Sequence, residues 1–201
     1  MHDFNRFWQW FADNNERLTM LNDLTDAEQQ QLLDDLQRNL DDYCEGLTFE
    51  IGDPTPSGRT LTFSAEGDTD LFRYVIDLTD NAPDFDWWEV VPFKQPKGTD
   101  LKVTFDKYRF ETKKMFFMQL ESEEEPDILG VRVALPDPVS DDDQLVGVYV
   151  TLEALIGEFD CATLVGYLDT CAIPPEPFKA GFRPLDDFPD FVEWFKQHRD
   201  A

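Results

Sequence analysis

Acidic side chains dominate this sequence and set the first condition that any fold of it has to meet. Of 201 residues, 43 are Asp or Glu and 17 are Lys or Arg, which gives a formal net charge of -26 at pH 7. Self-repulsion on this scale opposes a compact state, so the chain needs a strong apolar core. The sequence supplies one, because 41% of its residues are hydrophobic and 18 are Phe. Disordered chains pair high charge with few aromatic residues, so we expect a folded protein.

The same charge constrains the partners of the protein. Nucleic-acid phosphates and anionic lipid headgroups would be repelled, since binding to phosphate backbones depends on Lys and Arg. We therefore predict no nucleic-acid and no membrane partner, and a basic protein is the partner that this surface would attract. Two plainer interpretations stay open, namely that the acidity serves only solubility or that it adapts the protein to a salty cytoplasm.

Helical spacing of apolar residues predicts helices over 4–18, 25–44, 68–81 and 141–156, and a last helix that begins near Pro189. The second helix has the strongest start signal, because Thr25 and Glu28 have the spacing of a capping box. Asp3 and Asp68 are candidate N-caps for the first and third helices. Gly157 is expected to end the fourth.

Alternation and apolar runs predict six strands, over 47–51, 61–65, 87–93, 115–120, 128–135 and 165–171. The first two are separated by a Pro- and Gly-containing turn and read as a hairpin. We see no repeat and no linker long enough to require two domains. The sequence thus predicts one acidic α+β domain over 1–201, with a largely antiparallel sheet of about five to six strands covered by helices.

Catalytic motifs are missing from the sequence. Its two histidines, His2 and His198, lie near the ends, which argues against zinc sites and buried Ser-His-Asp triads. Cys44, Cys161 and Cys171 form no C-x-x-C pair and are expected to be reduced thiols. A Cys161–Cys171 disulfide stays open, as does a dyad of His198 with Cys161 or Cys44. Nucleotide-binding glycine loops and calcium loops are also missing, so we predict no catalytic, cofactor-binding or metal-binding residues.

Paired carboxylates are the remaining route to acid–base chemistry. Glu158 and Asp160, just after the predicted end of a helix at Gly157, are the first pair to inspect, although we favour ordinary loop solvation as their interpretation. Glu50, Glu66 and Glu89 lie on or beside predicted strands and fit the polar face of a half-exposed sheet.

One segment departs from the overall charge. Residues 94–114 contain seven Lys or Arg and three Asp or Glu, so their net charge is +4 while the rest of the chain carries -30. The segment reads either as a site for an anionic ligand or acidic partner segment, or as internal balance for neighbouring acidic side chains. We favour internal balance, since surface ion pairs are common and individually weak.

Several phrases together resemble an uncharacterised bacterial family, a domain of unknown function. They are FWQWF at 7–11, LTFEIG at 47–52, Ala82-Pro83 followed by Trp88, FKQP at 93–96 and LIGE at 155–158. The resemblance covers most of the chain and implies a single domain. It implies no activity, because the matching residues are aromatic, apolar or turn-forming.

We therefore predict a non-enzymatic, cytoplasmic interaction protein that binds a basic partner, as immunity or inhibitor proteins do. The alternatives are a small carboxylate-dependent hydrolase and acidity without a specific task. The chain shows neither a signal-peptide pattern nor an apolar run of about 18 residues. The oligomeric state cannot be read from the sequence.

Overall fold

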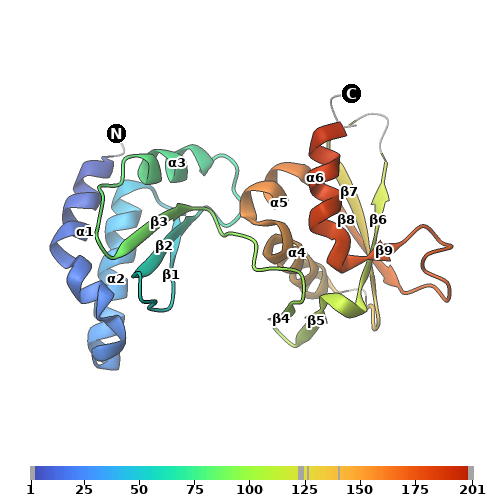
Figure 1. Ribbon diagram of the computed structural model, residues 1–201, viewed down its shortest axis with the longest axis horizontal. Helices are drawn as coiled ribbons and strands as arrows, with labels where there is room; N and C mark the ends of the chain where they lie inside the picture. Colours follow the sequence, from blue (N-terminus) through green and yellow to red (C-terminus); the bar gives the residue numbers. More distant parts are fainter. Residues whose placement is uncertain (1–2, 122–124, 126, 140, 199–201) are drawn as a thin grey trace. The chain divides into compact units, whose positions relative to one another are not determined.

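The computed structural model describes residues 3–121, 125, 127–139 and 141–198. The chain divides into two compact units, the N-terminal unit Met1–Lys94 and the C-terminal unit Gln95–Ala201. Each unit has its own sheets and helices (Figure 1). The predicted single domain spans both units, and whether they unfold together stays a prediction that an unfolding experiment addresses.

The N-terminal unit combines three helices with one three-stranded sheet. Its elements are α1 Phe4–Thr19, η1 Leu21–Asp23, α2 Asp26–Tyr43, β1 Thr48–Ile51, β2 Arg59–Ser64, α3 Phe72–Asp80 and β3 Trp88–Pro92. The strand order is β1-β2-β3, in which β1 and β2 are antiparallel and β2 and β3 are parallel. The parallel pair arises because α3 lies between β2 and β3 in the chain and returns it to the same edge.

Local capping explains where two of these helices begin. Thr25 and Glu28 form the predicted capping box, and Asp3 accepts a hydrogen bond from the Asn5 amide at 3.0 Å. The predicted cap at Asp68 is wrong. Its carboxylate instead accepts from the Asp70 amide within a turn, and α3 begins only at Phe72 without a side-chain cap. Asp68 therefore shapes the approach to the helix rather than its first turn.

Aromatic rings form the core of the N-terminal unit. Phe7, Trp8 and Phe11 on α1 are buried, and both Phe7 and Trp8 meet Phe63 of β2 in edge-to-face contacts. Trp8 donates from Nε1 to the carbonyl of Leu78 at 3.0 Å, so its polar atom is satisfied. The apolar spacing that predicted this helix thus corresponds to an aromatic face that packs into the core.

The C-terminal unit contains a four-stranded sheet, a separate hairpin and three helices. Its elements are β4 Lys102–Phe105, β5 Tyr108–Glu111, η2 Thr112–Lys114, β6 Phe116–Leu120, β7 Leu129–Leu135, α4 Asp142–Ile156, α5 Glu158–Leu164, β8 Val165–Ala172, β9 Arg183–Pro184, η3 Leu185–Asp187 and α6 Phe188–His198. The larger sheet has the order β8-β7-β6-β9, with β7 and β8 parallel. Side chains from β6, β7, α4 and α6 share one buried cluster.

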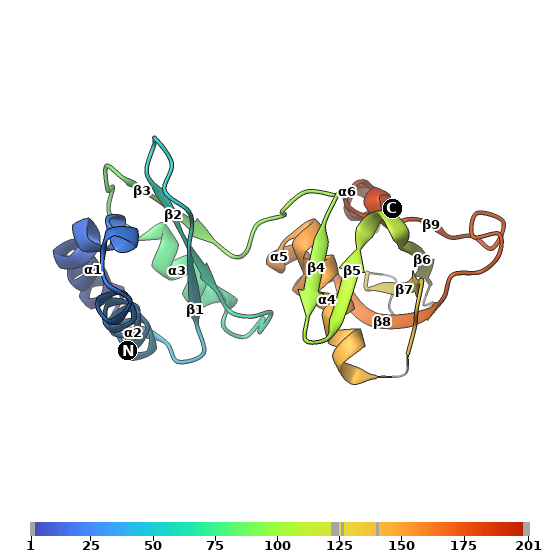
Figure 2. The same cartoon turned by 90° about the horizontal axis from the view of Figure 1, so that it is seen from below.

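A close approach fixes the β4–β5 hairpin to α4, beside which it lies in Figure 2. A Cβ atom on Gly147 would come within 2.5 Å of the Phe110 ring and 3.1 Å of the Phe105 Cβ. Glycine at this helical position therefore lets the hairpin lie directly on the helix backbone.

The α+β class is confirmed, but the prediction of one sheet with five to six strands is wrong. Within the described residues, nine strands form sheets of three, two and four strands. The periodicity of each strand is local, whereas its pairing partner is set by distant parts of the chain. No described helix is long and apolar enough to cross a membrane.

Candidate functional site

The basic segment 94–114 is largely balanced by nearby carboxylates. Four of its lysines form ion pairs, at Nζ–oxygen distances of 2.6–3.0 Å: Lys94–Glu66, Lys107–Asp141, Lys113–Asp100 and Lys114–Glu111. Within the described ranges, Lys97, Lys102 and Arg109 form no ion pair. Most of the local positive charge is therefore compensated by neighbouring acidic side chains, as the interpretation of internal balance expects.

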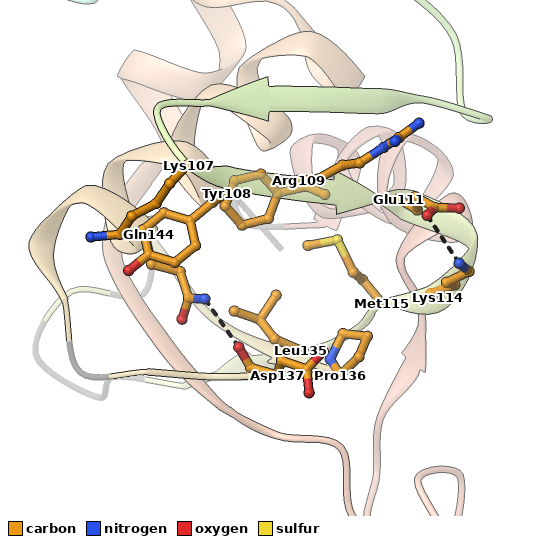
Figure 3. A pocket seen from close by; sticks show the side chains of 11 residues that line it. Lys107, Tyr108, Arg109, Glu111, Lys114, Met115, Leu135, Pro136, Asp137 and Gln144 are labelled. Carbon is orange, nitrogen blue, oxygen red and sulfur yellow. Dashed lines mark hydrogen bonds and ion pairs between the residues drawn. The ribbon is translucent and has the colours of Figure 1, made fainter.

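A hollow of about 310 Å³ lies against this segment and is called the hairpin pocket (Figure 3). β5, η2, the end of β7 and the start of α4 contribute its walls. Met115 and Leu135 turn into the hollow, while Arg109 extends away from it (Figure 3). Gln144 closes one side, because its Nε2 donates to the Asp137 carbonyl at 3.1 Å. The hollow thus has an apolar interior and a rim of both charges.

Asp141 neutralises the nearest lysine of the hairpin pocket. Its carboxylate accepts hydrogen bonds from the Tyr108 hydroxyl, from Lys107 Nζ at 3.0 Å and from the Asp143 amide. These bonds, that from Tyr108 first, lower the pKa of Asp141 to about 2. Because Lys107 is engaged and Arg109 points away, the hairpin pocket offers little to an anion.

The two carboxylates proposed for acid–base work have different surroundings. Asp160 forms an ion pair with Lys196 at 2.8 Å, whereas the Glu158 side chain is completely buried. Neither carboxylate lines the hairpin pocket or either of two hollows in the N-terminal unit, one beside α1 and one at the start of β2 and β3. None of these three hollows therefore gives the pair a space for a substrate.

The three strand-associated glutamates also differ from one another. Glu66 bridges Lys94 and the Thr48 hydroxyl, and Glu50 is exposed on β1. Glu89 is exposed on β3 and borders the hollow at the start of β2 and β3.

The thiols and histidines do not form an activated nucleophile in the described part of the chain. All three cysteines are free, and burial raises the pKa of the Cys161 thiol to about 12. A nucleophilic cysteine needs the opposite shift, because the thiolate is the reactive form. His198 stacks on Trp194 and contacts its carbonyl, and His2 lies outside the described residues.

A surface that sequence analysis missed lies beside α1 in the N-terminal unit and is called the acidic groove. It has a volume of about 750 Å³ and is formed by Asn15, Glu16, Thr19, Met20, Asp84, Phe85, Asp86 and Trp87. Trp87 and Met20 are 56% and 59% exposed. The rim carries three carboxylates and no Lys or Arg. An exposed aromatic and a flexible thioether beside a single sign of charge are typical of a contact surface.

The loop before β3 shapes the acidic groove, because its aromatic residues point alternately into the core and toward the surface. Phe85 packs against Trp8 and Phe11 at ring-centroid distances of 6.0 and 5.1 Å. The Trp88 amide donates to the Phe85 carbonyl at 3.2 Å, and the tight turn between them leaves Trp87 facing outward. The signal in the sequence was the acidic and aromatic run at 84–88, of which we interpreted only Trp87 and Trp88, as the start of the strand predicted over 87–93.

Metal ligands do not cluster in the described residues, among which no group of three or more His, Cys, Asp or Glu could hold an ion. No protein-family model, curated protein or solved structure matches this chain. The resemblance to a bacterial family therefore stays a prediction, and function has to be argued from the geometry of the sites.

Proposed function

We propose that this protein is a non-enzymatic, cytoplasmic interaction protein whose acidic groove docks on a basic protein partner. The observation that carries the proposal is the exposed pair Trp87 and Met20, bordered by Glu16, Asp84 and Asp86. Among the described residues these three carboxylates form no ion pair, so their charge is available to a partner.

The chemistry of the groove favours an arginine or lysine next to an apolar side chain. A cation over the face of a tryptophan is attracted by the ring quadrupole, which contributes about 0.5–2 kcal/mol depending on desolvation. Carboxylates at the rim would hold the same cation from the side. Met20 offers a soft apolar contact for a neighbouring residue of the partner.

The net charge of -26 contributes to the rate of encounter rather than to the final contacts. Opposite charges steer diffusing proteins together and raise association rates at low salt. A protein that masks a basic partner, as an immunity or inhibitor protein does, would use both features. The hydrolase hypothesis has no comparable support, because neither Glu158 nor Asp160 borders the hairpin pocket or the acidic groove.

The test compares two triple variants with the same change of net charge. E16Q/D84N/D86N neutralises the groove, whereas D53N/D70N/D80N neutralises three exposed carboxylates elsewhere on the N-terminal unit. Binding of a synthetic peptide of arginine and leucine is followed by Trp fluorescence at several salt concentrations. The groove variant should weaken binding about tenfold, since three rim charges contribute roughly 0.5 kcal/mol each.

The variant W87A separates the groove from general charge. It leaves the net charge unchanged and should weaken the peptide by about 30-fold if Trp87 is an anchor residue worth about 2 kcal/mol. Equal weakening by the two triple variants, with no effect of W87A, would mean that acidity alone attracts the peptide. That result would refute the proposal and favour acidity without a specific task.

A further inference from the structure

The four-stranded sheet of the C-terminal unit has an edge that is only partly covered. Strand β9 is the outermost strand beside β6, but it pairs with only two residues, Phe116 opposite Pro184 and Phe117 opposite Arg183. The loop that precedes β9 extends away from the sheet (Figure 1). Within the described residues, no strand pairs with residues 118–120 of β6 on this side. Unpaired backbone groups at a sheet edge can pair with a strand of another chain.

The hydrogen-bond pattern shows which backbone groups of β6 face this open edge. The Leu185 amide donates to the Met115 carbonyl at 2.9 Å, so these two residues form a hydrogen-bonded pair of the antiparallel ladder. Such pairs recur at every second residue, so the N–H and C=O of Phe117 are directed to β9 and those of Gln119 to the open edge. Pro184 fits this pattern, since it lacks an N–H and lies at a position without ladder hydrogen bonds. Gln119 therefore offers one donor and one acceptor to an added strand.

A hollow of about 130 Å³ lies where β9 leaves this edge, and we call it the edge hollow. Its lining residues are Phe117, Met118, Gln119, Gly181, Arg183 and Phe191. Phe117 packs against Phe191 of α6 at a ring-centroid distance of 5.2 Å, and the Arg183 guanidinium lies 5.4 Å from the centroid of the same ring. Side chains alternate along a strand, so Gln119 points to the same face as Phe117. The edge hollow thus opens on the α6 side of the sheet, and its size suits one small side chain.

Arg183 brings a positive charge to the edge hollow. Its side chain is exposed, and in the part of the chain that the structure describes it forms no ion pair. A guanidinium binds a carboxylate through two parallel hydrogen bonds, which makes a carboxylate the natural acceptor here. The net charge of -26 would repel a segment with several carboxylates. A ligand with a single carboxylate therefore fits best.

The course of β9 determines which end of a partner reaches Arg183. Strand β9 occupies the edge at Phe117, so a chain that adds to residues 118–120 has to end or turn away there. A strand antiparallel to β6 runs toward Arg183 and brings its carboxyl end to the guanidinium. A parallel strand would bring its ammonium end, which the guanidinium repels. Topology and charge thus favour the same occupant, a chain terminus that carries a carboxylate.

We propose that the open edge of β6 binds the free C-terminal end of a partner chain as an added antiparallel strand. The last residue of the partner lies opposite Gln119, whose C=O accepts from its N–H and whose N–H donates to its carboxylate. The small side chain of that residue enters the edge hollow, and the carboxylate also accepts from Arg183. This site lies in the C-terminal unit and does not depend on the acidic groove of the N-terminal unit.

NMR titration of the full chain with three tetrapeptides tests the assignment. The probes are acetyl-Thr-Ser-Thr-Val with a free carboxylate, its C-terminal amide, and an amide in which glutamate replaces the third residue. The free acid should shift the Gln119 amide signal and bind at least tenfold more tightly than the plain amide, which lacks the charge-assisted interaction. Equal affinity of these two, or an unmoved Gln119 signal, would overturn the proposal. Tighter binding of the glutamate peptide would assign the edge to an internal acidic segment instead.

Two pairs of variants assign the contacts. R183M should weaken the free acid at least tenfold and leave the plain amide unchanged. R109M, which removes an arginine of the β4–β5 hairpin with the same change of charge, should affect neither. Q119P removes the outward N–H and should weaken both peptides, whereas Q119A keeps this N–H and should weaken them much less. Proline is compatible with the sheet at this position, because the N–H of Gln119 does not face β7.

The melting temperature of Q119P checks that the variant is folded, and if it is not, the comparison of R183M with R109M decides. Equal effects of R183M and R109M on the free acid would refute the site. Sedimentation of the protein alone addresses a second copy as the occupant. Dimerisation that rises with concentration and is lost in Q119P would assign the edge to self-association and overturn the proposal.

Discussion

Replacement of Arg59 should lower the stability of the N-terminal unit by an amount that can be worked out from its hydrogen bonds. R59M keeps an unbranched apolar stem but leaves the Thr19 and Gly52 carbonyls and Asn22 Oδ1 without their donor. Three charge-assisted hydrogen bonds at about 1.5 kcal/mol each come to roughly 4.5 kcal/mol. Burial of the methionine and release of a buried charge offset about 1.5 kcal/mol of this. We expect a net destabilisation of about 3 kcal/mol.

Thermal unfolding followed by Trp fluorescence reports mainly on the N-terminal unit, in which Arg59 lies. Trp8, Trp10, Trp87 and Trp88 lie in the N-terminal unit, and only Trp194 lies in the other. If the N-terminal unit unfolds by itself, a loss of about 3 kcal/mol lowers its midpoint by roughly 12–24 °C. If all 201 residues unfold together, the same loss lowers the midpoint by roughly 6–12 °C. If the fluorescence and far-UV dichroism transitions coincide, the two units unfold together, as the prediction of a single domain requires. Separate transitions would mean that the units unfold independently.

The control for R59M is R38M. Arg38 is exposed on α2 and pairs with Asp35 one turn away, so its loss should change stability by less than about 0.5 kcal/mol. An R59M protein whose stability lies within about 1 kcal/mol of the native value would refute the reasoning. The three neutral oxygens would then be satisfied equally well without the guanidinium.

Three further outcomes are expected. Gly147→Ala should destabilise the protein by about 1–3 kcal/mol in chemical denaturation, because the added methyl group overlaps an aromatic ring of the β4–β5 hairpin; an unchanged midpoint would contradict the close approach. Tyr108→Phe should raise the pKa of Asp141 from about 2 in an NMR titration. A carboxylate whose pKa is lowered stabilises the folded state above its unfolded pKa of 3.8, and this contribution is lost as the pH falls through about 2. The Tyr108→Phe variant should therefore lose the contribution of Asp141 at a higher pH than the native protein does. At pH 8 a thiol reagent should label Cys171 well before Cys161, whose burial raises its pKa to about 12; labelling in the reverse order would contradict the buried site.

The elements that could be predicted are those whose signals are local. Thr25 and Glu28 lie one turn apart and form their capping box without help from the rest of the fold. Gly157 ends α4 in the structure with φ of 85°, as its position after an apolar helical face predicted. Pro189 lies in the first turn of α6, near the predicted start.

The elements that were missed depend on distant contacts or on composition that hides a pattern. Val103, Phe105, Tyr108 and Phe110 place apolar side chains on the β4–β5 hairpin, but the surrounding lysines led us to interpret the segment by charge alone. The division into three sheets was hidden for another reason. Strand β6 pairs with both β7 and β9, and the sequence of residues 116–120 does not indicate which strands it pairs with.

The candidate sites were missed for the same reason. The acidic groove needs the end of α1 to meet the loop at 84–87, and these segments are far apart in the sequence. Sequence analysis did not single out Arg59, because nothing local reveals that its guanidinium becomes buried. Burial and the loss of a counter-ion are properties of the assembled chain.

The placement of β9 and α6 sets an order of events during synthesis. All three strands of the N-terminal unit have been made once β3 ends at Pro92, so this unit can fold while the rest is still being translated. In the other unit, Phe117 of β6 packs against Phe188 and Phe191 of the last helix. At about 5–20 residues per second, Phe117 waits roughly 4–15 s for these rings to emerge. During that interval the nascent β6–β7 hairpin exposes apolar surface, and it is then that a chaperone would be needed most.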